Sequence, residues 1–274
     1  MQNKDYEIVD FHTHPFLGDY DNICAHKPHC DMSTENIIRD LKAVGITKIC
    51  GSNIVRVSNL KPESNPEPTQ WDAVKTCNDG ALKLRESLGD FYIPGIMVHP
   101  DYVRESCEEI ERAYSLGVRL IGELVPYMHG WNDYSCDGFG ELLELAADKD
   151  MIVSIHSMGE DNMDKMLANH PRTKIVFAHP GEYGEVTRHI KRMKGRENCW
   201  LDLSGYGIFR HGMLRAAIDE LGVEKLIFGS DYPTCNPAMY VGGVLLDPLI
   251  SDIEKEAIFA GNARRLFASC GLAI

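Results

Sequence analysis

The chain has 274 residues, 44% hydrophobic and 25% charged, and this composition is typical of an ordinary folded protein. Its 41 acidic residues outnumber 28 basic ones, the formal charge is −13, and no run of lysine and arginine stands out, which argues against nucleic acid or an anionic membrane as the partner. The first residues lack the apolar core of a signal peptide, no stretch is long enough to cross a membrane, and the nine scattered cysteines form no C-x-x-C pair, so we expect a cytoplasmic protein.

Short apolar or β-branched runs recur along the chain, separated by amphipathic segments with apolar residues at helical spacing. Eight such runs are predicted to be strands, at residues 7–11, 46–51, 91–98, 118–124, 151–156, 174–179, 200–204 and 225–230. This alternation predicts a (β/α)8 TIM barrel with parallel strands, spanning residues 1–274 as a single domain. A doubly wound open sheet is the alternative, but no G-x-G-x-x-G follows the first strand.

Helix boundaries support this alternation. Ser33 and Thr34 are typical of a helix start, and Gly45, Gly117 and Gly222 are each placed to end a helix shortly before the next strand. The connections between helix and strand are therefore expected to be short.

Two histidines, His12 and His14, follow the apolar pair Ile8-Val9 at the end of the first predicted strand. Alternate residues of a strand point to the same face, so the two imidazoles would project together, about 7 Å apart along the strand. One metal ion can bridge that gap. Two unrelated histidines beside a turn are the alternative.

In a parallel barrel the carboxyl ends of the strands meet at one end, where catalytic residues lie. Five of the predicted strands end on residues that bind metals or transfer protons. These residues are His12 and His14, Glu123, His156, His179 and Asp231.

Several motifs in this order resemble the amidohydrolase superfamily, in particular the amidohydrolase-related branch that contains aminocarboxymuconate semialdehyde decarboxylase-like enzymes. The motifs are His12-Thr13-His14, Ser154-Ile155-His156, Phe177-Ala178-His179-Pro180, the segment from Phe228 to Pro233, and the segment from Gly261 to Phe267. The resemblance implies a divalent metal, usually zinc, held by His12, His14, His156 and Asp231. It also implies that His179 either binds a second metal or hydrogen-bonds the water on the first.

A divalent metal held by three imidazoles and one carboxylate retains an open position, lowers the pKa of a water there and polarises a substrate carbonyl. We expect Asp231 to accept the proton of that water and pass it to the leaving group, and His179 to orient the water or stabilise an oxyanion. The alternatives are a turn or N-cap role for Asp231 and a buried, satisfied imidazole for His156 and His179.

The superfamily often carries a carboxylated lysine at the end of the fourth strand, whereas this chain has Glu123 there. A glutamate can bridge two metals with its two oxygens, but Glu123 could equally form a salt bridge or bind substrate. The sequence therefore leaves open whether the site binds one metal ion or two. Asp10 shares the strand face of the two histidines, and either fixes their tautomers or is a polar residue satisfied by backbone or water.

Substrate choice is expected to reside in the loops that follow the strands. The first loop contains Cys24, His26, His29 and Cys30, which we interpret as part of a lid or pocket wall, with a second metal site as the alternative. Tyr127, followed in its loop by His129, Trp131 and Tyr134, suggests an aromatic wall. Arg210 could bind a substrate carboxylate, and Arg56 lies near the start of the second loop.

The sequence therefore predicts a metal-dependent hydrolase that acts on an amide, lactone or ester-like carbonyl of a small molecule. A metal-dependent non-oxidative decarboxylase uses the same ligands and is the alternative. A barrel that binds metal or ligand without turnover is a further alternative, although the complete ligand set argues against it. We expect zinc, as one or two ions, a small-molecule substrate, and neither nucleic acid nor a membrane as the partner; a monomer and a homo-oligomer are both open.

Overall fold

The structure is a computed structural model, and it describes residues 6–16, 33–60, 67–205 and 207–274. The predicted lid residues Cys24, His26, His29 and Cys30 lie outside the described residues. Eight parallel strands run in chain order around one sheet, each paired with the next along the sequence. They are β1 (Val9–Asp10), β2 (Lys48–Gly51), β3 (Tyr92–Ile96), β4 (Leu120–Leu124), β5 (Ile152–His156), β6 (Lys174–Ala178), β7 (Cys199–Asp202) and β8 (Leu226–Ile227).

The first and last strands meet beyond their regular parts and close the barrel. The Phe11 amide donates to the Phe228 carbonyl over 2.9 Å, the Asp231 amide to the His12 carbonyl over 2.8 Å, and the His14 amide to the Tyr232 carbonyl over 2.7 Å. Thr13 and Tyr232 form a parallel bridge. The predicted (β/α)8 TIM barrel is therefore confirmed, and its seam is formed by the segments that carry His12, His14 and Asp231.

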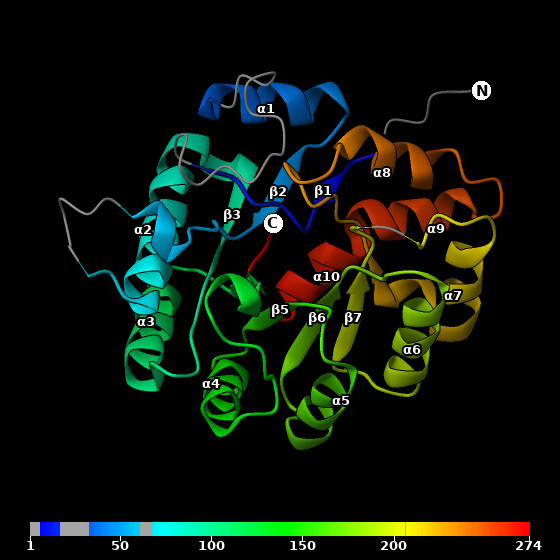
Figure 1. The fold of residues 1–274 in the computed structure, drawn as a ribbon. Coiled ribbons are helices and arrows are strands. Elements are labelled where there is room, and N and C mark those ends of the chain that lie inside the picture. The colour runs from blue at the N-terminus through cyan, green and yellow to red at the C-terminus, as the bar shows by residue number, and fades with distance from the viewer. Residues whose placement is uncertain (1–5, 17–32, 61–66, 206) are drawn as a thin grey trace.

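Helices connect the strands and surround them (Figure 1). Ser33 caps the first helix by accepting from the Asn36 amide, and Gly45, Gly117 and Gly222 follow their helices with positive φ angles, as predicted. The helices in the described part of the chain are α1 (Thr34–Ala43), α2 (Gln70–Leu88), α3 (Val103–Ser115), α4 (Asp137–Asp148), α5 (Glu160–Asn169), α6 (Tyr183–Met193), α7 (Met213–Leu221), α8 (Pro237–Leu245), α9 (Asp252–Glu256) and α10 (Asn262–Ala268).

The helix α10 closes the barrel near the starts of its strands. Leu266 and Phe267 are buried in one apolar cluster with Val9, Leu120 and Ile152, each from a different strand. Figure 1 shows α10 in the middle of the ring of helices. Because α10 fills this end, the opposite end, where the strands finish, is the one left for a site.

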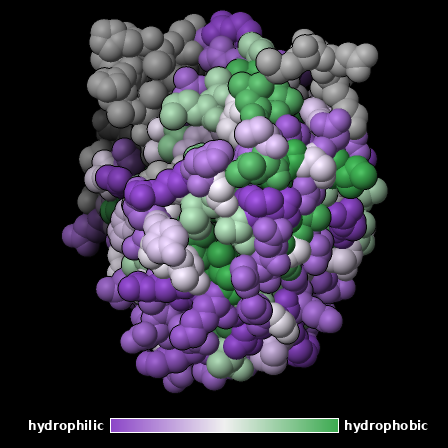
Figure 2. Space-filling model, turned by 90° about the vertical axis from the view of Figure 1, so that its right-hand side faces the viewer, coloured by the Kyte–Doolittle hydropathy of each residue, from purple (hydrophilic) through white to green (hydrophobic). Residues whose placement is uncertain are grey.

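Apolar side chains are also exposed on α8, on α9 and between them: Met239, Leu245, Leu246, Leu249 and Ile253. Figure 2, which views the molecule from this side, shows apolar patches within a largely hydrophilic surface. Exposed apolar groups occur on monomers as well as at protein contacts, so the expected homo-oligomer stays a prediction. Among the described residues, no helix is both long and apolar enough to cross a membrane.

Acid is expected to destabilise the fold partly through His129, which is fully buried and whose Nε2 donates to the Val55 carbonyl over 3.0 Å. Burial, above all, lowers the pKa of His129 from 6.5 to about 4. The unfolded chain therefore binds a proton below pH 6.5 that the folded protein does not take up, and the free energy of unfolding falls by about 2–3 kcal/mol between pH 6.5 and 4.5 from this residue.

Denaturant unfolding at pH 7.5 and 4.5 measures this loss. His129→Gln keeps a hydrogen-bond donor but cannot titrate, so we expect the variant to lose less stability on acidification than the wild type. An equal loss in both proteins would show that His129 does not contribute.

Candidate metal centre

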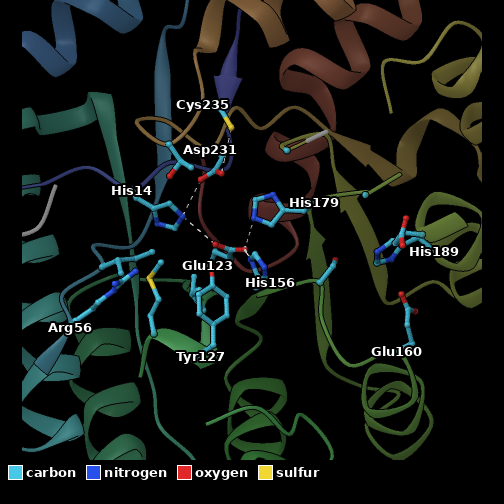
Figure 3. A pocket seen from close by; sticks show the side chains of 18 of the residues that line it. His14, Arg56, Glu123, Tyr127, His156, Glu160, His179, His189, Asp231 and Cys235 are labelled. Carbon is cyan, nitrogen blue, oxygen red and sulfur yellow. Dashed lines mark hydrogen bonds and ion pairs between the residues drawn. The ribbon is translucent and has the colours of Figure 1, made fainter. Parts of the chain in front are cut away.

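All six side chains that the sequence placed at the strand ends come together at the carboxyl end of the barrel. Figure 3 shows Glu123 with four of the others, His14, His156, His179 and Asp231, around its carboxylate. The groups His12, His14, Asp231 and His12, Glu123, His179 each place their ligand atoms within 4.8 Å of one another. His12, His14, Glu123 and Asp231 are buried, whereas His156 and His179 are partly exposed.

The first set of donors surrounds one point. His12 Nε2 lies 3.2 Å from His14 Nε2, and the two nitrogens lie 3.3 and 3.2 Å from Glu123 Oε2. The same nitrogens lie 3.6 and 3.5 Å from Asp231 Oδ1. Ligands about 2.0–2.2 Å from a tetrahedral divalent ion are separated from one another by about 3.3 Å, so these four groups fit such an ion.

The hydrogen bonds behind the two histidines fix their tautomers. His14 Nδ1 lies 3.0 Å from the Ser52 carbonyl oxygen, and His12 Nδ1 lies 3.0 Å from Asp202 Oδ2. Both partners are acceptors, so each Nδ1 carries a proton and each Nε2 is the ring atom directed at the other donors. The two Nε2 atoms face each other across 3.2 Å, close enough for one cation to bind both in place of a proton.

The other oxygen of Glu123 faces a second set of donors. Glu123 Oε1 lies 3.0 Å from His156 Nδ1 and 3.2 Å from His179 Nε2. One carboxylate thus has a different histidine pair at each oxygen, which is the geometry of a bridging ligand. Glu123 is buried and lies among the other donors, and it is not part of a surface salt bridge.

Asp202 and Ser204 support the site, and sequence reasoning missed both. Asp202 is fully buried at the end of β7, and the Ser204 hydroxyl donates to its Oδ1. Ser204 Oγ also lies 2.9 Å from His12 Nδ1 and 3.1 Å from His179 Nδ1, so it accepts from these rings. The signal in the sequence was the i, i+2 spacing of the two residues at a strand end, which places them on the same face.

Local backbone geometry directs two of the side chains. His179 and Asp231 adopt φ angles of +61° and +59°, a left-handed conformation that is uncommon outside glycine and that clusters at functional sites. Gly229 leaves the room that His12 needs, because a Cβ at residue 229 would lie 2.8 Å from the Cβ of His12.

The site favours positive charge. Burial alone would lower the pKa of His12, but the carboxylates of Asp202 and Glu123 outweigh it and hold that pKa well above 6.5. Burial alone would raise the pKa of Glu123, yet His12 and His179 hold it well below 4.5. The carboxylates therefore stay ionised and attract cations.

Within the described part of the chain, Asp10 makes no hydrogen bond to the imidazole of His12 or His14. It accepts from the backbone amides of His12 and Ser230, over 3.2 and 2.9 Å, and from the Ser230 hydroxyl. Of the two readings offered by the sequence, the structure supports the barrel-interior residue satisfied by backbone. Burial raises the pKa of Asp10 to about 7.

A cavity of about 670 Å³ opens over the centre. It is bordered by His14, Glu123, His156, His179 and Asp231, and among the residues described Arg56 is the only lysine or arginine in its lining. Tyr127 lines the cavity, with its ring 5.3 Å from that of His156.

The other loop residues that were expected to contact substrate lie away from the cavity. Trp131, Tyr134 and His129 are buried, because they pack in the core or hydrogen-bond to it, so the aromatic wall predicted for them is wrong. Arg210 is exposed, pairs with Glu182 and does not border the cavity.

A sequence model of the amidohydrolase family matches residues 65–268, about three quarters of the chain. A search of the curated proteins found no match. Among solved structures, the chain resembles an uncharacterised TIM-barrel protein from Bordetella bronchiseptica, at 20% identity over 97% of this chain and all of the other, with a TM-score of 0.75.

Two further solved structures have named activities. One is a dihydroxybenzoic acid decarboxylase from Polaromonas with bound manganese and the inhibitor 2-nitroresorcinol, at 16% identity over 96% of this chain and 97% of the other, with a TM-score of 0.70. Another is a provisionally assigned 2-pyrone-4,6-dicarboxylic acid hydrolase from Pseudomonas putida, at 18% identity over 96% and 98%, with a TM-score of 0.67. At these identities the likeness shows the fold, and the family match over most of the sequence shows that the chain belongs to the amidohydrolase family.

Proposed function

We propose that the protein is a metal-dependent hydrolase of small molecules whose reacting group is an amide, a lactone or a similar carbonyl. The observation that carries this proposal is the pair of Nε2 atoms of His12 and His14, 3.2 Å apart, beside the carboxylates of Glu123 and Asp231. Burying these polar and charged groups together costs folding free energy unless a cation binds them.

We propose that two divalent ions bind, expected to be zinc, because imidazole and carboxylate ligands suit it. His12, His14, Asp231 and Glu123 Oε2 would hold one ion, and Glu123 Oε1, His156 and His179 the other. When bound, such ions supply Lewis acidity, which polarises a carbonyl and lowers the pKa of water. The manganese of the Polaromonas decarboxylase makes manganese the second metal to test.

The protein groups have distinct tasks. Asp231 borders the cavity and can take a proton from the attacking water and pass it to the leaving nitrogen or oxygen. His179 also borders the cavity, and its Nδ1 is held by the Ser204 hydroxyl, so its ring is oriented before substrate arrives. Tyr127 offers an aromatic surface at the mouth beside His156.

Decarboxylation is the second candidate, and Arg56 is the observation that favours it. A guanidinium on the wall of a metal-containing cavity suits a substrate carboxylate. The resemblance to a dihydroxybenzoic acid decarboxylase points the same way. In that reaction the carboxylate leaves as carbon dioxide and a proton replaces it on carbon.

Metal content per chain, measured on protein purified without chelator, tests the proposal first. We expect about two ions in the wild type and, in His12→Ala, the loss of at least the ion that His12 would hold. The metal-loaded protein is then assayed on lactones, cyclic amides and aromatic carboxylic acids, with carbon dioxide release recorded separately. Wild-type protein that binds no divalent metal would contradict both candidate reactions.

Replacement of Arg56 tests carboxylate recognition. We expect Arg56→Ala to raise the KM of a carboxylate-bearing substrate by about 10-fold or more, because a charge-assisted hydrogen bond is lost. Arg210→Ala is the matched control and should leave KM unchanged, since Arg210 pairs with Glu182 away from the cavity. Equal effects of the two variants on KM would contradict the assignment of Arg56.

A further inference from the structure

A second polar group borders the cavity at a distance from the candidate metal ligands. His189, on α6, is fully buried and lines the same cavity as Glu123 and His179. In Figure 3 it lies beside Glu160, on the opposite side of the metal centre from Arg56. None of the roles described above uses it.

The tautomer of His189 is fixed by Arg192, one helical turn further along α6. Arg192 Nη1 lies 3.3 Å from His189 Nδ1. A guanidinium can only donate, so Nδ1 accepts and the neutral ring carries its proton on Nε2. Burial first, and the charge of Arg192 second, lower the pKa of His189 to about 3, so the ring stays neutral near pH 7.

Arg192 is itself held in place from α5. Its Nε donates to Asp164, and its Nη2 donates to Glu160. The Arg192 side chain is only 3% exposed, and the ring of His189 packs 5.2 Å from that of Phe177. The orientation of His189 is therefore built into the contact between α5 and α6 rather than left to solvent.

Among residues 6–16, 33–60, 67–205 and 207–274, the Nε2 atom of His189 has no hydrogen-bond partner. Burying an unsatisfied N–H group is unfavourable, and buried donors in proteins are nearly always paired. A buried donor that is fixed in direction and lacks a partner, on a residue that lines the cavity, is suited to an acceptor atom that arrives with the ligand.

The surrounding charges restrict what that acceptor can be. Glu185 lies four residues before His189 on α6, hence on the same helix face, and both Glu185 and Glu160 line the cavity. Glu160 is ion-paired with Arg192, but the carboxylate of Glu185 disfavours an anionic group here. A hydroxyl satisfies both kinds of neighbour, because it accepts from an N–H and donates to a carboxylate.

We propose that His189 is the donor of a substrate-recognition subsite that takes a hydroxyl group on the part of the substrate remote from Arg56. The proposal rests on the function proposed above and names a feature of its substrates. The cavity would then select substrates at both ends, by the charge of Arg56 at one end and by a hydrogen bond from neutral His189 at the other.

Pairs of straight-chain acids that differ by one terminal hydroxyl test the subsite in the metal-loaded protein. The probes are pentanoate, hexanoate and octanoate, each compared with its ω-hydroxy acid by calorimetry. We expect the hydroxyl to tighten binding about 5- to 10-fold at one chain length in the wild type. His189→Phe keeps the ring but removes the donor, so this preference should disappear.

The matched control is His170→Phe, because His170 ends α5, pairs with Glu144 and lies outside the cavity lining. That variant should retain the preference. If no hydroxy acid binds more tightly than its parent acid in the wild type, or if His189→Phe keeps the preference, the subsite is overturned.

Nitrogen NMR of the wild type provides a measurement that does not depend on a variant folding. We expect His189 to show a proton on Nε2 and its signal to shift with the preferred hydroxy acid but not with the parent acid. A proton on Nδ1, or equal shifts with both acids, would overturn the proposal. Metal content of the same samples reports on the proposed function separately.

Discussion

Asp202→Asn is expected to weaken the binding of a divalent ion by about 10- to 100-fold, the range observed when a partner behind a metal-binding histidine is changed. Asp202 Oδ2 lies 3.0 Å from His12 Nδ1 and holds the proton on that nitrogen. An asparagine amide can instead donate to Nδ1, which moves the proton to Nε2 and removes the lone pair that faces His14. The substitution changes no group that would touch the ion.

Competition with a chromogenic chelator measures this affinity for zinc and for manganese. Asp219→Asn is the matched control, since Asp219 is an exposed residue of α7 that pairs with Arg215, and it should bind metal as the wild type does. Unaltered zinc affinity in Asp202→Asn would show that Asp202 does not fix the tautomer of His12.

Glu123→Gln is expected to reduce the metal content from about two ions per chain to one or fewer. Its carboxylate oxygens lie 3.2 Å from His14 Nε2 and 3.0 Å from His156 Nδ1, and glutamine has only one oxygen to offer. The rate should fall at least about 100-fold, above the range typical of groups that act only behind a ligand. The same variant also loses the negative charge that raises the pKa of His12 and His179.

Elemental analysis and steady-state rates are measured together for this variant. Glu109→Gln is the control, because Glu109 is a buried glutamate that pairs with Arg112 on α3 and does not line the cavity. A wild type with a single ion that Glu123→Gln retains would contradict the bridging role.

The barrel was predictable because its signals are local and repeated. Each of the eight predicted apolar runs overlaps an observed strand, and seven contain the strand whole, whereas β7 begins one residue before its predicted run. The strands β1 and β8 are only two residues long, since the chain beyond them forms the irregular seam that carries the ligands.

The six residues around the metal centre were predictable because each lies at the end of a strand or shortly after it and has a side chain able to bind metal. What supports them was harder to see. Ser52 contributes only a backbone carbonyl, which any residue could supply, and Asp202 resembles an ordinary polar end of a strand. The sequence places both Arg210 and Arg56 in loops and does not distinguish them as carboxylate-binding residues. Only the folded chain shows that Arg210 pairs with Glu182 and that Arg56 borders the cavity.

The seam of the barrel has a consequence for the biosynthesis of the protein. One proposed ion would be shared between His12 and His14 and, more than two hundred residues later in the sequence, Asp231. These donors cannot come together on a ribosome-bound chain until the segment around Asp231 has emerged and paired with that around His12. An ion bound to both segments would stabilise this closing contact, so metal binding would be coupled to completion of the barrel.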